Sequence, residues 1–253
     1  MLALIGGTGL NTLEGIEGFQ LSRAEGIATR YSETTVEVSV YSYLGNELLF
    51  IPRHGDGHVV PPHKINYRAN IDALRLAGAT RVVAMNAIGG IAPQLCPGSI
   101  AIPTQIIDYS YGRISSFYED DLDGVVHIDF GEPYSRELRQ ALLDAAARAN
   151  APRREPVAVI DGGVYGCTQG PRLETYAEIK RLQADGCTMV GMTGMPEAAL
   201  AREAGLEYAT IGLVVNWAAG LTQDTITLDE IYEVIETVSP FLHTLIREVI
   251  EPI

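Results

Sequence analysis

The feature of this sequence that most constrains its fold is a repeated alternation. Short apolar runs rich in β-branched residues, such as Leu2–Ile5 and Tyr208–Val215, alternate from end to end with longer segments in which apolar residues recur at helical spacing. Runs that are apolar on both faces are typical of strands in a buried sheet, and helical spacing is typical of the helices that cover it. The pattern therefore predicts α/β architecture with a largely buried sheet.

The predicted elements can be placed by residue range. Strands are expected at Leu2–Ile5, Thr35–Tyr43, Glu47–Ile51, Arg81–Asn86, Ser99–Ile107, Pro156–Tyr165, Thr188–Met192 and Tyr208–Val215. Helices are expected at Lys64–Ala77, Ser135–Ala149, Glu174–Gln183, Pro196–Glu203 and Leu228–Val249. No repeat, low-complexity tract or linker rich in Pro and Ser divides the chain, so a single domain over residues 1–253 is expected.

Two segments depart from the simple alternation. The last predicted helix is long and amphipathic, and it contains Pro240, which is expected to kink it. The segment Asp108–Pro133 has mixed polarity, many tyrosines and acids, and little periodicity. Long segments of this kind in compact domains are usually functional or interfacial, and we expect the same here.

Composition narrows the partners and the compartment. The chain has 18 Lys and Arg against 32 Asp and Glu, a net charge of -14 that repels phosphate backbones and anionic lipid. No nucleic-acid or membrane partner is therefore expected, and no apolar stretch approaches the roughly 20 residues of a membrane helix. The first residues lack the pattern of a signal peptide, and Cys96, Cys167 and Cys187 form no C-x-x-C pair, which argues against disulfides or a cysteine zinc site. The cytoplasm is the expected location.

Two predicted strands lead into residues that suit an anion. In Gly6–Gly9 the glycines let backbone N–H groups approach a ligand and Thr8 adds a hydroxyl, although a tight strand exit explains the same residues equally well. Arg53 and His54 follow another strand and lie beside glycines. In an acidic protein this pair predicts a local positive spot suited to phosphate.

The same histidine-rich stretch has a competing interpretation as a metal site. Imidazole and carboxylate groups ligate zinc or iron, and the stretch offers four such side chains in His54, Asp56, His58 and His63. The intervening glycines prevent a helical pair of histidines, so the spacing is not specific for a metal. A solvated loop is a further explanation for His58 and His63.

Four more polar residues stand where predicted strands end or helices begin. They are Asn86, Glu174, Thr193 and Asn216. Ligands of open α/β sheets collect beyond the carboxyl ends of strands, and a threonine at a helix N-terminus suits an anion. Three of them also have a structural explanation: Asn86 as a turn residue, Glu174 as a partner of the helix dipole and Asn216 as a cap.

Taken together and in order, these segments resemble the trimeric branch of the purine nucleoside phosphorylase and methylthioadenosine phosphorylase family, from Gly6 to about Val249. The resemblance is carried by Gly-Gly-Thr-Gly at 6–9, Arg-His-Gly at 53–55, Asn-Tyr-Arg-Ala-Asn-Ile at 66–71, Gly-Pro-Arg-Leu-Glu-Thr at 170–175, Gly-Met-Thr at 191–193 and Pro-Glu at 196–197. It implies a single domain with a central twisted mixed β-sheet flanked by helices. It also implies that phosphate attacks C1′ of a purine nucleoside and that the base departs.

The resemblance implies a role for each matching residue. Phosphate would be held by Thr8, Arg53, His54, Asn86, Ala87 and Thr193; the base by Leu173, Glu174, Asn216 and Ala218; and the ribose with its 5′ group by Met192, His127, Leu228, Ile231 and Tyr232. Asn216, Glu174 and His54 would be the catalytic residues. Inorganic phosphate would be the co-substrate, with no metal or organic cofactor, and the assembly would be a homotrimer in which His127 belongs to the neighbouring subunit's site.

The base site and the 5′ site both bear on substrate choice. Glu174 can accept a hydrogen bond from N1–H of a 6-oxopurine, while Asn216 can donate to N7 or O6, and Ala218 stands where adenine-selective members of the family have an aspartate. Members of the family that bind a 5′-hydroxyl have a histidine near the start of the last helix, and none occurs here between Asn216 and Tyr232. The resemblance therefore implies an apolar pocket for a methylthio group. Together these features imply phosphorolysis of 5′-methylthioinosine to hypoxanthine and 5-methylthioribose 1-phosphate, in purine salvage.

Several alternatives remain at this level. Within the family they are a 6-oxopurine phosphorylase acting on inosine and guanosine, and a methylthioadenosine phosphorylase. Outside it they are a metal-dependent hydrolase built on the histidine cluster and a noncatalytic protein that binds purine or phosphate.

Overall fold

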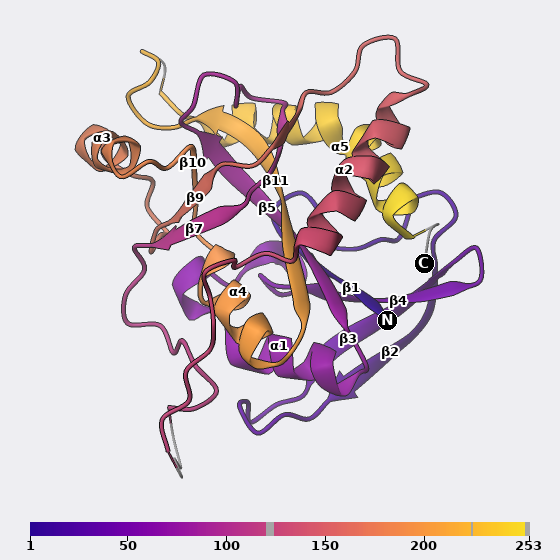
Figure 1. Cartoon of the computed structure of the whole chain (residues 1–253). Coiled ribbons are helices and arrows are strands. Elements are labelled where there is room, and N and C mark those ends of the chain that lie inside the picture. Colours follow the sequence, from indigo (N-terminus) through magenta and orange to yellow (C-terminus); the bar gives the residue numbers. More distant parts are fainter. Residues whose placement is uncertain (120–123, 224, 251–253) are drawn as a thin grey trace.

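The computed structural model describes residues 1–119, 124–223 and 225–250, and its described strands form one mixed sheet of 11 members (Figure 1). The strands are β1 (Leu2–Gly6), β2 (Gln20–Ile27), β3 (Val36–Tyr43), β4 (Asn46–Pro52), β5 (Arg81–Gly90), β6 (Ile100–Ile102), β7 (Gln105–Asp108), β8 (Val159–Asp161), β9 (Val164–Cys167), β10 (Met189–Gly191) and β11 (Glu207–Trp217). The α-helices are α1 (Tyr67–Leu76), α2 (Arg136–Asn150), α3 (Tyr176–Ala184), α4 (Gly194–Glu203) and α5 (Leu228–Ile250). This single-domain arrangement confirms the predicted fold class.

The centre of the sheet is formed by parallel strands. β5 pairs in parallel with β1 on one side and with β11 on the other, and β1 pairs in parallel with β4. All five residues of β1 are buried, as are most residues of β5 and β11. Because parallel strands point the same way, the chain leaves β1, β4, β5 and β11 at one common edge.

Helices cover both faces of the sheet. α2 and α5 pack together on one face, while α1 and α4 pack together on the other, as Figure 1 shows. A smaller apolar cluster lies under α3 and includes Ile179 and Leu182. Side-chain caps explain why three of these helices begin where they do: Asn66 caps α1, Ser135 caps α2, and Thr175 forms a capping box with Glu178 at α3.

The predicted strands are right in position and wrong in several boundaries. β2 was not expected, because its residues are exposed throughout apart from the half-buried Ile27, and an exposed strand lacks the apolar alternation that reveals a strand. The expected strand 156–165 is two strands, because the chain turns at Gly162 and Gly163, both at positive φ. The expected strand 99–107 is likewise divided into β6 and β7. β5 continues to Gly90 instead of ending at Asn86.

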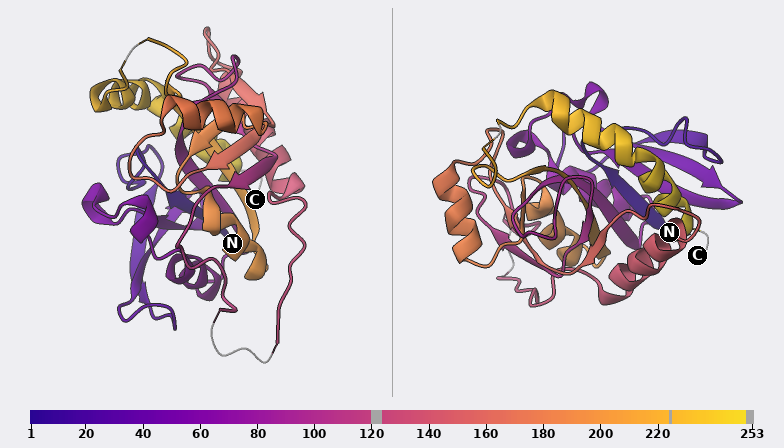
Figure 2. Two further views of the ribbon diagram at one scale, coloured as in Figure 1. Left: turned by 90° about the vertical axis from the view of Figure 1, so that its left-hand side faces the viewer. Right: turned by 90° about the horizontal axis from the view of Figure 1, so that it is seen from above.

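The two unusual segments also take shape. α5 runs through Pro240 as one helix, and its C-terminal half buries Phe241, Leu245 and Val249 against the sheet and α2; the kink stays a prediction. Residues 109–119 and 124–133 contain no helix or strand and extend beyond the body as a long loop (Figure 2). Residues 120–123 of that predicted segment, like 251–253 of the predicted domain, lie outside the described residues. None of the described helices is both long enough and apolar enough to span a membrane.

Candidate active site

A cavity of about 460 Å³ opens at the edge of the sheet where the parallel strands end. It brings together twelve of the residues predicted for the site: Thr8, Arg53, His54, Ala87, Leu173, Glu174, Met192, Thr193, Asn216, Leu228, Ile231 and Tyr232. These residues come from seven separate stretches of sequence. Their convergence favours a binding site over the separate structural explanations that the sequence alone allows for each.

The glycine-rich loop after β1 owes its sequence to close packing behind the cavity. A Cβ at Gly7 would lie 2.4 Å from the carbonyl oxygen of Met85 and 3.0 Å from Nη1 of Arg53. Only glycine allows the loop to approach β5 and the arginine this closely. The loop thereby places Thr8 at the cavity wall.

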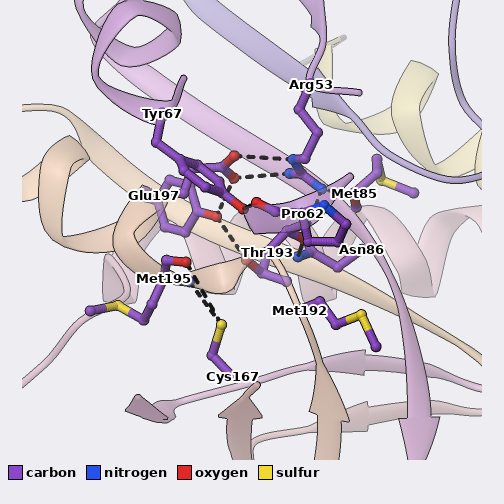
Figure 3. Close-up of polar contacts among 12 residues, drawn as sticks. Arg53, Pro62, Tyr67, Met85, Asn86, Cys167, Met192, Thr193, Met195 and Glu197 are labelled. Carbon is purple, nitrogen blue, oxygen red and sulfur yellow. Dashed lines mark hydrogen bonds and ion pairs between the residues drawn. The ribbon is translucent and has the colours of Figure 1, made fainter. Parts of the chain in front are cut away.

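Arg53 is buried and forms an ion pair with Glu197 from the first turn of α4. Nε and Nη2 of the guanidinium donate to the two carboxylate oxygens at 3.0 and 2.9 Å, and both side chains are 1% exposed (Figure 3). Nη1 donates to the carbonyl oxygen of Met85 at 2.7 Å, and the Tyr208 hydroxyl donates to Glu197 at 2.7 Å. Four hydrogen bonds fix the guanidinium in the wall, and the one from Tyr208 holds its carboxylate partner.

The hydroxyl of Thr193 receives hydrogen bonds from two donors. Nη1 of Arg53 lies 3.3 Å from Oγ1 of Thr193, and Nδ2 of Asn86 lies 2.8 Å from the same atom (Figure 3). Because two donors point at its oxygen, the hydroxyl hydrogen is free to point elsewhere, and Thr193 lines the cavity. This position therefore offers a hydrogen-bond donor to an acceptor in the cavity, next to the N-terminus of α4.

The prediction of a local positive charge at Arg53 and His54 is wrong. The arginine charge is matched by the buried carboxylate of Glu197, whose role as an ion-pair partner the sequence does not indicate. Burial lowers the pKa of His54 to about 4, and the charge of Arg53 acts in the same direction, against the hydrogen bond to Val60. His54 is therefore neutral at pH 7. Its Nδ1 lies 2.8 Å from the carbonyl oxygen of Val60 and must donate there, which leaves Nε2 as an acceptor.

The competing interpretation as a metal site concerns the histidines of this stretch. The rings of His54 and His58 lie against each other with centroids 4.2 Å apart. Among the described side chains, which do not include that of Asp56, no group of three or more His, Cys, Asp or Glu residues could hold a metal ion.

Glu174 also lines the cavity and lies just before α3. It is half-buried, and Oγ1 of Thr168 donates to its Oε1 at 2.6 Å. Burial raises the pKa of the Glu174 carboxyl above its ordinary value, while the hydrogen bond from Thr168 opposes that rise. Glu174 precedes the helix, which begins at Tyr176, so the expected helix start is two residues early. Leu173 beside it is 46% exposed and lines the cavity.

Asn216 is turned toward the cavity by an irregularity in β11. The pairing of β11 with β5 shifts register between Val214 and Asn216, so one extra residue is inserted on the β11 side. Such bulges redirect the side chains that follow them and recur beside active sites. The Asn216 amide donates to the carbonyl oxygen of Trp217 at 2.6 Å and lines the cavity.

The remaining wall is largely apolar. Met192 follows β10, and the first turn of α5 contributes Leu228, Ile231 and Tyr232. Leu228 and Tyr232 are 69% and 49% exposed, although the rest of α5 is buried along one face. Apolar side chains left open at a cavity mouth are typical of a binding surface.

Three predicted site residues do not line this cavity. Asn86 lies behind it inside β5, where its amide supports Thr193. Ala218 is buried in the cluster under α3, and its backbone N–H donates to the carbonyl oxygen of Gly90 at the end of β5. His127 is exposed on the loop 124–133, outside the cavity of its own chain.

Sequence reasoning also missed Arg113, which comes from the long loop. Its guanidinium donates to the carbonyl oxygens of Met192, Met195 and Gln169 at 2.9, 2.5 and 2.8 Å. It thus ties the stretch before Glu174 to the stretch around Thr193. Nothing in the local sequence signals this, because an arginine in an irregular polar segment is ordinarily solvated.

Comparisons with known proteins identify the family of the chain. The model of the phosphorylase superfamily matches residues 2–251. "Probable S-methyl-5'-thioinosine phosphorylase" of Xanthomonas campestris is 48% identical over 248 residues, covering 98% of this chain and 96% of that protein. "6-oxopurine nucleoside phosphorylase" of Pyrococcus furiosus is 40% identical over 250 residues, covering 97% and 90%. The structure of methylthioadenosine phosphorylase from Schistosoma mansoni in complex with adenine has a TM-score of 0.89 at 29% identity, covering 99% and 91%.

Proposed function

The chain belongs to the phosphorylase superfamily, and from this premise we propose that it cleaves 5′-methylthioinosine with inorganic phosphate to give hypoxanthine and 5-methylthioribose 1-phosphate. The observation that carries the proposal is the composition of one cavity. A donor suited to an anion, a carboxylate suited to N1–H of a 6-oxopurine, and a set of apolar side chains all line it. The name of the Xanthomonas relative supports the same substrate.

Phosphate is proposed to bind between Thr8, Arg53 and Thr193. The hydrogen of the Thr193 hydroxyl is available to a phosphate oxygen, because Arg53 and Asn86 already donate to its own oxygen. His54 is neutral with Nε2 as an acceptor, which suits the single P–OH of hydrogen phosphate. The site therefore recognises phosphate mainly through directed hydrogen bonds, with Ala87 adding its backbone at the wall.

In the proposed reaction a phosphate oxygen forms a bond to C1′ while the bond from C1′ to N9 breaks. The electron pair of that bond leaves with the purine, and the proton that the purine takes up is balanced by the one that hydrogen phosphate loses on becoming the sugar phosphate. Positive charge develops on the ribose, so phosphate acts both as nucleophile and as counter-charge, and positioning carries most of the rate. The reaction as proposed uses no cofactor.

Base recognition is assigned to Glu174 and Asn216. An ionised Glu174 accepts from N1–H of hypoxanthine, and the Asn216 amide donates to N7 or O6 and so stabilises the departing base. Adenine has no N1–H and would leave the carboxylate unpaired, a mismatch that costs orders of magnitude in specificity. Leu173 packs on the base, and Ala218 contributes only by having no polar side chain.

The 5′ group is proposed to meet Leu228 and Ile231, beside Met192 under the ribose. These side chains offer no hydrogen bond to a 5′-hydroxyl and suit a methylthio group. His127 is proposed to complete the pocket of a neighbouring subunit in a homotrimer. Its neighbours Val125 and Val126 are 78% and 47% exposed, and a second subunit would cover them.

A 6-oxopurine nucleoside phosphorylase acting on inosine is the second candidate. It is favoured by the phenol of Tyr232, which lines the same wall and could bond a 5′-hydroxyl. The name of the Pyrococcus relative points the same way.

Base release from four nucleosides tests the proposal. Methylthioinosine, methylthioadenosine, inosine and adenosine are compared with and without phosphate. We expect phosphate-dependent release with the highest kcat/KM for methylthioinosine. A higher value for inosine would refute the assignment of the 5′ wall, and a higher value for methylthioadenosine would refute the roles of Glu174 and Asn216.

A further inference from the structure

Thr168, at the end of β9, contacts the carboxylate assigned to base recognition. Its Oγ1 lies 2.6 Å from Oε1 of Glu174 and 3.3 Å from the carbonyl oxygen of Gly191. That carbonyl already accepts the backbone N–H of Thr168 at 2.8 Å. The shorter contact and the satisfied carbonyl both assign the single hydroxyl proton to Glu174.

This bond matters because a carboxyl group presents different chemistry in its two protonation states. As a carboxylate it only accepts, which matches N1–H of a 6-oxopurine. As a carboxylic acid it can donate, which matches the bare N1 of a 6-aminopurine. The hydroxyl of Thr168 stabilises the first state and occupies one carboxylate oxygen, leaving the other for the base.

The structure also provides a place to which an untethered Glu174 could turn. A second cavity of about 390 Å³ shares Glu174 with the first and is also lined by Thr168, Arg172 and Arg181. Arg172 and Arg181 are paired with Glu178 and Asp185, but each guanidinium carries five N–H donors, so a free carboxylate would still find hydrogen bonds there, away from the nucleoside. The bond to Thr168 opposes this movement.

We propose that Thr168 is a positioning residue that sets base specificity, by holding Glu174 as an oriented carboxylate toward the nucleoside cavity. The inference rests on the proposed role of Glu174. The nearby charged side chains act on Glu174 in opposite directions, since Arg172 lowers and Glu178 raises the pKa of its carboxyl. The Arg172 guanidinium is itself paired with the Glu178 carboxylate, at 2.7 and 2.8 Å. The hydroxyl of Thr168 is therefore suited to decide the state of Glu174.

The test measures kcat/KM for methylthioinosine and methylthioadenosine in five proteins: wild type, Thr168→Val, Thr168→Ser, Glu174→Gln and Thr188→Val. Thr188 is the matched control, because it is also half-buried and its hydroxyl donates to a backbone carbonyl, that of Val164, away from both cavities. Thermal midpoints of all five report on folding. Thr168→Ala replaces Thr168→Val if the valine variant does not fold.

We expect Thr168→Val to lower kcat/KM for methylthioinosine about tenfold or more, the usual effect of losing a hydrogen bond to a charged group. The value for methylthioadenosine should fall less or rise, so the ratio of the two substrates should drop. Thr168→Ser should restore the wild-type ratio, and Thr188→Val should not change it.

The outcomes separate the inference from the function beneath it. If Glu174→Gln changes the substrate ratio and Thr168→Val does not, the inference is wrong and the base-recognition proposal stands. The inference is also wrong if Thr168→Val lowers both substrates equally. If Glu174→Gln leaves the ratio unchanged, the role of Glu174 is wrong and the inference fails with it.

Discussion

The buried ion pair between Arg53 and Glu197 makes the most quantitative prediction. Glu197 is 1% exposed and accepts hydrogen bonds from Nε and Nη2 of Arg53 and from the Tyr208 hydroxyl. In Glu197→Gln one carboxylate oxygen becomes an NH₂ group, which points hydrogens at a guanidinium that can only donate. The substitution also leaves the charge of Arg53 buried without a counter-charge. Removing one partner of a buried pair costs about 3–5 kcal/mol.

The assay is urea unfolding followed by circular dichroism. With a slope of about 3 kcal/mol per M, the upper value for small proteins, the midpoint should fall by about 1–1.7 M while the slope stays unchanged. Glu47→Gln is the control, because Glu47 pairs with Arg23 at 2.7 Å on the surface. Its midpoint should not move measurably. A shift for Glu197→Gln as small as that of Glu47→Gln would refute the reasoning.

Phosphate should act on this variant in a characteristic way. An anion in the cavity supplies the charge that Glu197→Gln removed, so saturating phosphate should raise the midpoint of the variant more than that of the wild type. Arg53→Met combined with Glu197→Met removes both charges and should cost less stability than Glu197→Gln alone. The double variant should lose phosphate-dependent stabilisation. Equal stabilisation of wild type and Glu197→Gln by phosphate would contradict an anion site at this position.

Three further predictions concern other parts of the site. The pKa of His54 is about 4 in the folded protein and about 6.5 when unfolded. The contribution of His54 to the free energy of unfolding should therefore be complete above pH 6.5 and decline by up to about 3 kcal/mol as the pH falls toward 4. Unfolding of His54→Gln across this range should show a shallower decline. Arg113→Lys loses the planar fork that bonds several carbonyl oxygens and should lower kcat/KM about tenfold or more. The control is Arg139→Lys, because Arg139 bonds the carbonyl oxygens of Pro103 and Ile102 away from the cavity. This control should leave kcat/KM unchanged. Ile231→Asn should reduce the preference for methylthioinosine over inosine by about tenfold, and an unchanged ratio in parallel kinetics would remove Ile231 from the 5′ pocket.

The parts of the site that could be predicted from sequence are those positioned by strands. Thr8 and Arg53 follow buried strands, Asn216 lies near the end of another, and parallel strands bring their carboxyl ends to one edge. Residue type and strand order therefore suffice to predict that these side chains meet. The glycine-rich loop is likewise explained by the approach of Gly7 to Met85.

The parts that could not be predicted depend on partners far apart in sequence. Glu197 neutralises an arginine 144 positions away, and Arg113 reaches the cavity walls from a loop that has no periodicity. The neutral state of His54 follows from burial, which its polar sequence neighbours do not indicate. The edge strand β2 was missed for a related reason, since exposed residues carry no alternation. Tertiary contacts, and not local pattern, decide each of these features.

The most direct test of the account is a crystal structure of the protein with hypoxanthine and phosphate. We predict N1 of the base within about 3 Å of the Glu174 carboxylate, and a phosphate oxygen within about 3 Å of Oγ1 of Thr193. The purine should lie between these groups and the apolar start of α5. A base that presents another edge to Glu174, or a phosphate bound away from Thr193, would contradict the proposed site.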